Sequence, residues 1–255
     1  MQLFEAVYRP QHFYVFHVDA RMTFERQLLQ RMIGERFHHQ IDNIVVLPED
    51  RSFVTSWGSF GLVRALLEAY EELCRMGVWD FVIDLSGADL PLRKVEDLSL
   101  ALAPYRNQSF LAFHGVGYKN APNQMDPEAM KGLHLEAFYA CDGFTFNVTR
   151  HGKPLLFSDM KMASASQWSV LSRHLVEDLL DQRRHPPAWT KHHFYMATAV
   201  IPDESYIPTF AVNSGHTVNN MAVHLTKAFN GQDAYRLCRH LNDADFCGRG
   251  ESTEN

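Results

Sequence analysis

Short apolar runs alternate with longer amphipathic stretches through the first half of the chain. Residues 12–19, 43–47 and 81–85 are apolar runs that favour strands, and each ends at a polar residue or a proline. Residues 23–36 and 59–76 are predicted helices between them. Strands that alternate with helices are typical of βαβ units, so the sequence predicts an α/β fold with a parallel sheet. The longer helix has one apolar face, formed by Leu62, Leu66, Leu67, Tyr70 and Leu73.

The second half of the chain has a weaker pattern. It predicts strands at residues 108–113 and 166–170, a helix at 172–182 and a further helical turn at 191–199. Residues 115–132 are rich in Gly, Pro and Asn and predict a loop. No linker or repeat divides the sequence. We therefore expect one domain over residues 1–255, with an irregular part over residues 220–255.

Composition and charge restrict the classes of function. Hydrophobic residues make up 46% and charged residues 21% of the 255 residues, as in an ordinary folded domain. The net charge is −6, which disfavours general binding to nucleic acid or to anionic membranes. No segment has the roughly 20 apolar residues of a membrane helix, and the first residues do not form a secretory signal. We therefore expect no nucleic-acid partner and no membrane segment in this chain.

Polar residues lie at or just beyond three of the predicted strands. They are Asp19, residues 55–58 and residues 86–89. Ligands of open α/β sheets bind at the carboxyl ends of the strands, so these positions are candidates for a binding site. The chain has neither a Gly-rich dinucleotide fingerprint nor a P-loop. A nucleotide, if bound, is held in another way.

Five blocks of sequence occur in a recognisable order and spacing. They are HFYVFHVDAR (12–21), SWG (56–58), WDFVIDLSGADLPLR (79–93), SQWSVLSR (166–173) and IPDES (201–205). Together they resemble the protein O-xylosyltransferases of the core-2/I-branching glycosyltransferase family (GT14-like). The third block alone is long enough to be specific, and the blocks together cover most of the chain.

The resemblance implies a fold and an activity. The fold is a GT-A-like nucleotide-sugar transferase fold, in which helices flank a central, mostly parallel sheet. The activity is an inverting transfer of xylose from UDP-xylose to serine hydroxyls of proteoglycan core proteins, the first step of the glycosaminoglycan linker. The family acts in the Golgi or endoplasmic reticulum lumen. Compared with it, the chain looks truncated at both ends, before Met1 and after Asn255.

The same resemblance assigns the catalytic base. A serine hydroxyl is a weak nucleophile at neutral pH, so an inverting transfer needs one carboxylate to take its proton. The position that matches is Glu204. The alternative is that Glu204 and Asp203 form a capping pattern ahead of a short helix.

Donor-binding roles fall on two of the strand ends. Asp19 and Arg21 resemble the residues that hold the uridine, since a carboxylate accepts hydrogen bonds from uracil or ribose. Thr55, Ser56 and Trp57 resemble the wall beside the donor sugar. The alternatives are that Asp19 is an exposed cap of its strand and that Trp57 is an ordinary core aromatic.

Gln167 and Trp168 would lie against the reacting sugar. A Trp at this position resembles the xylosyltransferases more than the glucosaminyltransferases. Gln167 departs from the Asp of the animal xylosyltransferases, so the amide keeps a hydrogen bond while a charge is lost. The difference bears on rate or donor choice and leaves the fold unchanged.

The resemblance also implies that no metal cofactor is required. Asp243 and Asp245 form an Asp-x-Asp triplet, but it lies far along the chain from the strand end where that motif binds a metal. The family neutralises the diphosphate of UDP with an Arg-Lys pair. No equivalent is visible in this sequence, and Arg249 is a weak substitute.

The cysteines match the family in part. Cys238 and Cys247 correspond to one of its disulfides, and Arg236 and Arg249 stand at the two positions of a second, absent bridge. A zinc site that includes His240 is the alternative, although four ligands at zinc spacing are missing. We expect Cys74 and Cys141 to be buried thiols.

Two rival functions stay open from the sequence. One is a β-1,6-N-acetylglucosaminyltransferase that acts on a glycan acceptor. The other is a non-catalytic relative that binds a nucleotide sugar or an acidic peptide without transfer, which the missing Arg-Lys pair and Gln167 favour.

Overall fold

The first half of the chain alternates strands and helices, as predicted. The computed structural model describes residues 2–37, 42–113, 137–141, 144–148, 162–181, 187–199 and 201–221. The helices at residues 2–7 and 95–102 and the short 3-10 helices were not predicted, whereas every strand and helix that was predicted in this half occurs, the strands being shorter than expected. The elements are α1 (Gln2–Val7), β1 (Tyr14–Phe16), α2 (Thr23–Phe37), β2 (Ile44–Val46), η1 (Glu49–Arg51), α3 (Phe60–Met76), β3 (Phe81–Ile83), α4 (Val95–Leu102), η2 (Ala103–Tyr105) and β4 (Gln108–Leu111).

The second half differs more from the prediction. The strand expected at residues 166–170 begins only at its last residue, and the expected helical turn at 191–199 is part of a longer helix that starts earlier. The hairpin β5–β6, the helices η5 and α8 and the strand β8 were not predicted. The elements are β5 (Phe138–Cys141), β6 (Phe144–Asn147), β7 (Val170–Ser172), α6 (Arg173–Leu180), α7 (Pro187–Met196), η5 (Pro202–Glu204), α8 (Tyr206–Asn213) and β8 (Thr217–Asn220).

The strand pairing is mixed, which corrects the expectation of a mostly parallel sheet. β1 and β2 pair in parallel, and a separate four-stranded sheet has the order β3-β7-β4-β8. Within it β4 and β8 are parallel, but β7 is antiparallel to both of its neighbours. β7 enters the sheet at the end where β3 leaves, since the Asp84 amide donates to the Ser169 carbonyl over 3.0 Å. The α/β class itself is confirmed.

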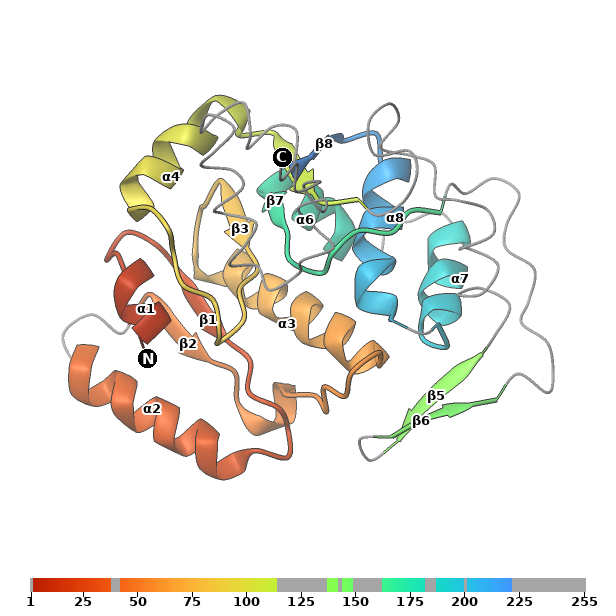
Figure 1. Ribbon diagram of the computed structural model, residues 1–255, viewed down its shortest axis with the longest axis horizontal. Coiled ribbons are helices and arrows are strands. Elements are labelled where there is room, and N and C mark those ends of the chain that lie inside the picture. The colour runs from red at the N-terminus through yellow and green to blue at the C-terminus, as the bar shows by residue number, and fades with distance from the viewer. Residues whose placement is uncertain are drawn as a thin grey trace, which may run out of the picture.

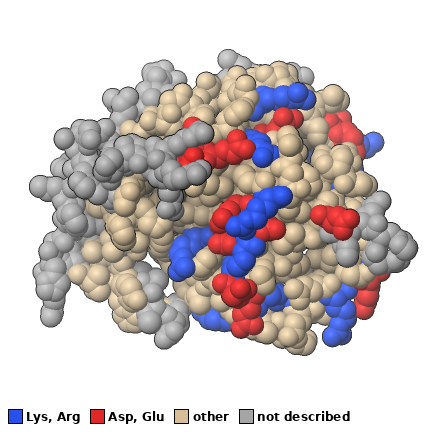
Figure 2. Space-filling view, turned by 180° about the vertical axis from the view of Figure 1, so that it is seen from behind, with Lys and Arg blue, Asp and Glu red and all other residues tan. Residues whose placement is uncertain are grey.

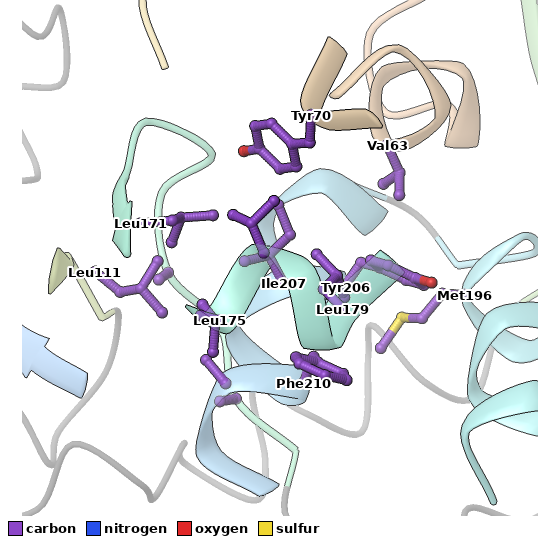
Figure 3. Close-up of a cluster of buried hydrophobic side chains, with 14 of the residues drawn as sticks. Val63, Tyr70, Leu111, Leu171, Leu175, Leu179, Met196, Tyr206, Ile207 and Phe210 are labelled. Atoms are coloured by element: carbon purple, nitrogen blue, oxygen red, sulfur yellow. The ribbon is translucent and has the colours of Figure 1, made fainter. Parts of the chain in front are cut away.

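The main hydrophobic core forms around α3, which crosses the middle of the molecule (Figure 1). Its predicted apolar face is confirmed in part, because Tyr70 and Leu73 are buried and Leu66 and Leu67 pack against the same cluster, whereas Leu62 is only half-buried and the buried Val63 was not predicted. Side chains of α3, β7, α6 and α8 meet there (Figure 3). This packing fixes the start of α3 relative to the segments that precede β7 and α8.

A smaller aromatic cluster holds β1 and β2 against α1 and α2. The Phe4 ring lies about perpendicular to the rings of Tyr14 and Phe16, with ring centroids 5.0 Å apart in both pairs. Edge-to-face contacts of this kind are favourable for aromatic rings. The cluster explains why the short helix α1 forms although its sequence carries little periodicity.

Acidic and basic side chains are mixed on the molecular surface. On the face opposite to that of Figure 1, Lys and Arg lie beside Asp and Glu (Figure 2). Arg51, for example, contacts Glu68 and Glu72 at 2.5 Å each. Among the described residues, no helix is both long and apolar enough to span a membrane.

Candidate functional site

The Asp19 carboxylate joins the exit of β1 to the segment that follows η1. Its Oδ2 accepts hydrogen bonds from the amide and the hydroxyl of Thr55, at 2.8 and 2.9 Å. The amide and guanidinium of Arg21 donate three further bonds, each of 2.9 Å. Arg21 and, to a lesser extent, Thr55 hold the pKa of Asp19 well below its usual range. The structure therefore brings Asp19, Arg21 and Thr55 together, and Asp19 is more than an exposed strand cap.

Two residues that the sequence analysis missed support this strand end. The His17 Nε2 accepts a hydrogen bond from the Phe53 amide over 2.9 Å, which requires the neutral ring; burial lowers the pKa of His17 and so favours that form. The buried Arg26 donates to the carbonyl oxygens of residues 18 and 19. In the strand that the sequence predicts over residues 12–19, His17 and Asp19 share a face at i, i+2, which is a signal the sequence offers. No pattern pointed to Arg26.

The turn of Ser56, Trp57 and Gly58 leads directly into α3. Ser56 is buried, and its carbonyl accepts from the Ser59 amide over 3.0 Å. Gly58 has φ 72°, a conformation that glycine adopts at little cost. Trp57 is 77% exposed, so its interpretation as a core aromatic is wrong. An exposed indole next to the candidate donor site is free to contact a ligand.

Glu204 lies on η5, in a loop that is hydrogen-bonded both to the Trp57 turn and to the segment before Gln167 and Trp168. The Ile201 amide donates to the Gly58 carbonyl over 3.3 Å, and the Ala165 amide donates to the Glu204 carbonyl over 2.8 Å. The loop that carries Glu204 is thereby bonded to the Trp57 turn and to the segment before β7. Glu204 itself is half-buried.

The backbone just before Glu204 is strained. Ile201 has φ 50°, in the left-handed region that is unfavourable for a β-branched residue. Strain of this kind persists where the surroundings enforce it and clusters at functional sites. Asp203 is buried at 6% exposure, and burial raises its pKa to about 6. Ser205, the N-cap of α8, forms no side-chain capping bond.

Gln167 and Trp168 lie in a short loop that is fixed at both ends. The Ser166 amide donates to the Ala112 carbonyl over 2.9 Å, and the Ser166 hydroxyl accepts from the Trp168 amide over 3.2 Å. At the other end Ser169 is bonded to Asp84 through its hydroxyl and its carbonyl. Both predicted sugar-contacting side chains are half-buried, so each keeps an accessible part.

Some of the remaining candidate residues lie in the described part of the chain, and the others lie outside it. In the turn 86–89, Asp89 is buried and accepts from the Ser86 amide over 2.6 Å, so this turn is closed by its own bond. Cys74 is a partly buried free thiol, and burial raises its pKa. In the part of the chain that the structure describes, no cluster of three His, Cys, Asp or Glu residues has a metal-binding arrangement. Outside the described residues lie the Cys141 side chain, Arg236, Cys238, His240, Asp243, Asp245, Cys247 and Arg249.

Comparisons with known proteins agree on one family. A family model described as "Branch: Core-2/I-Branching enzyme" matches residues 1–240. The chain is 29% identical to Xylosyltransferase 1 of Canis lupus familiaris, over 97% of this chain and 24% of that protein. It is also 29% identical to Xylosyltransferase 2 of the same species, over 97% of this chain and 27% of that protein. A Xylosyltransferase of Ciona intestinalis is 28% identical, over 97% of this chain and 27% of that protein. The chain thus spans about a quarter of the length of the curated relatives that it matches.

Proposed function

The chain belongs to the Core-2/I-branching enzyme family, and on that premise we propose that it is an inverting glycosyltransferase domain of GT-A-like fold that moves xylose from UDP-xylose to serine hydroxyls of core proteins. The names of its relatives support the sugar and the enzyme class. The reaction would start a glycosaminoglycan linker.

One observation of the structure carries the proposal. The half-buried Glu204 follows the strained Ile201 on a loop that is hydrogen-bonded to Gly58 on one side and to Ala165 on the other. Both predicted walls of a donor-sugar pocket, the Trp57 turn and the loop of Gln167 and Trp168, are thus attached to the loop that carries the proposed base. Rigid attachment keeps reacting groups in a productive geometry.

In the proposed reaction the serine oxygen attacks C1 of xylose from the face opposite to UDP. The bond between C1 and the β-phosphate oxygen breaks, UDP leaves with the electron pair, and the configuration at C1 inverts. Glu204 takes the proton of the serine hydroxyl. A positioned general base of this kind contributes a factor of about 10²–10⁴ to the rate.

We propose that Arg21 is the member of the uridine site that faces the nucleotide. The Asp19 carboxylate already accepts five hydrogen bonds from Arg21 and Thr55, which fills its acceptor capacity. The Arg21 side chain is 49% exposed and keeps donors for uracil or ribose oxygens. Asp19 then fixes the guanidinium, and Thr55, Ser56 and Trp57 form the adjoining wall of the donor site.

The proposal includes no resident metal. Basic residues on the diphosphate are what the family resemblance implies, and Arg249 is the candidate that this sequence offers. A location in the Golgi or endoplasmic reticulum lumen and a disulfide between Cys238 and Cys247 belong to the same proposal.

A donor screen tests the proposed function. The assay measures release of UDP from UDP-xylose and from UDP-N-acetylglucosamine, with and without a Ser-Gly peptide or a glycan acceptor, and calorimetry measures UDP binding. We expect UDP binding and a peptide-dependent release of UDP from UDP-xylose. Release that depends on the glycan acceptor and on UDP-N-acetylglucosamine would favour the branching activity, and binding without any acceptor-dependent release would contradict transfer.

A further inference from the structure

A buried carboxylate that the proposed reaction does not use lies at the exit of β3. Asp84 is 9% exposed, and its Oδ2 accepts hydrogen bonds from the Tyr70 hydroxyl and the Ser169 hydroxyl, each of 2.7 Å. Tyr70 and Ser169 are themselves buried. We refer to Asp84, Tyr70 and Ser169 as the Asp84 cluster.

The Asp84 cluster connects α3, the helix that follows one wall of the proposed donor-sugar pocket, to the loop that forms the other wall. Tyr70 belongs to α3, the helix that begins directly after the Trp57 turn. Its hydroxyl points from α3 toward the side of the core where Leu171 of β7 lies (Figure 3). Ser169 ends the loop of Gln167 and Trp168. One carboxylate oxygen is therefore bonded to both elements.

The loop of Trp168 has few other anchors. Its first residue, Ser166, is bonded to the carbonyl of Ala112, the residue after β4, and Trp168 donates to the Ser166 hydroxyl. The far end is held by the two bonds between Ser169 and Asp84, of 2.7 and 3.0 Å. Loss of the Asp84 carboxylate would remove the side-chain bond and leave the backbone bond alone at this end of a loop whose middle carries the large indole.

We propose that Asp84 is a positioning residue that sets the distance between the Trp57 turn and Trp168, and so restricts the donor sugar to a pentose. This inference rests on the proposed function. A pocket wall that moves outward admits the hydroxymethyl and N-acetyl groups that distinguish N-acetylglucosamine from xylose. A hydrophobic pocket discriminates a single methylene by about 10–200-fold, so a shift of the wall that excludes these larger groups should change the sugar selectivity by at least the lower figure.

The proposed role of Asp84 requires an oxygen that accepts the two hydroxyl hydrogen bonds, and it does not require a negative charge. An amide oxygen also has two lone pairs, so Asn at position 84 retains an acceptor for both hydroxyls. Burial raises the pKa of Asp84 to about 6, which means that the site does not favour the charged form. Asp84→Asn is therefore the conservative variant that should preserve the cluster, whereas Asp84→Ala and Ser169→Ala remove it.

The test measures backbone amide hydrogen exchange and the selectivity between the two donor sugars, both on the full chain. We expect Asp84→Ala and Ser169→Ala to accelerate exchange in the peptide that contains Trp168, and to lower the ratio of kcat/KM for UDP-xylose over UDP-N-acetylglucosamine about tenfold. UDP affinity should stay within twofold. Asp84→Asn should match the wild type in both readouts. Ile33→Ala, in the separate cluster near α1, controls for a general loss of stability.

The outcomes separate this inference from the proposed function. If wild-type protein transfers no xylose, the proposed function fails and the pentose restriction fails with it, while exchange still decides whether Asp84 anchors the loop. If the wild type is active and Asp84→Ala changes neither exchange nor selectivity, the inference is wrong. It is equally wrong if Asp84→Asn loses selectivity as fully as Asp84→Ala, or if Ile33→Ala loses it to the same extent.

Discussion

At the scale of single residues, the surroundings shift the pKa values of the aspartates in and around the candidate site in opposite directions. Arg21 and Thr55 stabilise the ionised form of Asp19, and its pKa is held low. Asp84 and Asp203 are buried, and burial raises the pKa of each to about 6. The Asp203 Oδ1 is buried, and none of the described residues donates a hydrogen bond to it. At neutral pH the protein therefore carries two buried carboxylates at a cost in stability.

This cost predicts a pH dependence of the free energy of unfolding. An aspartate has a pKa of about 3.9 in an unfolded chain, and the folded value of about 6 for Asp203 is higher. The folded state then binds more protons than the unfolded state between these values, so stability falls as pH rises through about 6. Asp203→Asn should remove its share of the fall, on the order of 2–3 kcal/mol. Urea denaturation at pH 4 and pH 8 measures it, with the exposed Asp50→Asn as control. An equal fall in wild type and Asp203→Asn would contradict the assignment.

At the scale of elements, long amphipathic segments could be predicted from the sequence, whereas short ones could not. The 17 residues of α3 carry an apolar face, and the helix was predicted correctly; of its buried positions, Tyr70 and Leu73 were predicted and Val63 and Ala65 were not. β7 has three residues, all buried, and such a run carries no information on strand direction. η5 begins after Ile201, whose backbone is in the left-handed conformation. Tertiary contacts impose this conformation, and no local sequence pattern predicts it. The element that carries the proposed base was therefore recognised by resemblance and not by pattern.

The start of α3 allows a matched glycine test. A Cβ at Gly61 would lie 2.0 Å from the Val54 carbonyl oxygen, whereas a Cβ at Gly34 of α2 would meet nothing within 4 Å. Gly61→Ala should lower the free energy of unfolding by about 1–3 kcal/mol. It should also weaken UDP-xylose binding, because Val54 adjoins Thr55. Gly34→Ala should be neutral or stabilise the helix by up to about 1 kcal/mol. Calorimetric unfolding and titration measure both effects, and equal behaviour of the two variants would contradict the close approach.

At the scale of the whole molecule, the candidate site is assembled from segments far apart in sequence. Residues 17–21, 53–58, 165–169 and 201–204 are linked by bonds that no short-range pattern encodes, such as Ile201 to Gly58 and Ala165 to Glu204. The sequence supplied the candidate residues, but it did not predict that Asp19 is saturated by Arg21 and Thr55 or that Asp84 joins α3 to the segment 165–169. Those facts depend on tertiary packing. The chain spans about a quarter of its curated relatives, so its activity has to be measured on this chain itself.

The most direct test of the central claim is the rate of xylose transfer by Glu204→Gln to a Ser-Gly peptide, with UDP affinity measured in parallel. The matched control is Glu71→Gln, which changes an exposed carboxylate paired with Arg75 and should leave the rate unchanged. If Glu204 is the base, its variant should transfer at least about 100-fold more slowly while UDP affinity stays within twofold. Transfer by Glu204→Gln at close to the wild-type rate would contradict the account.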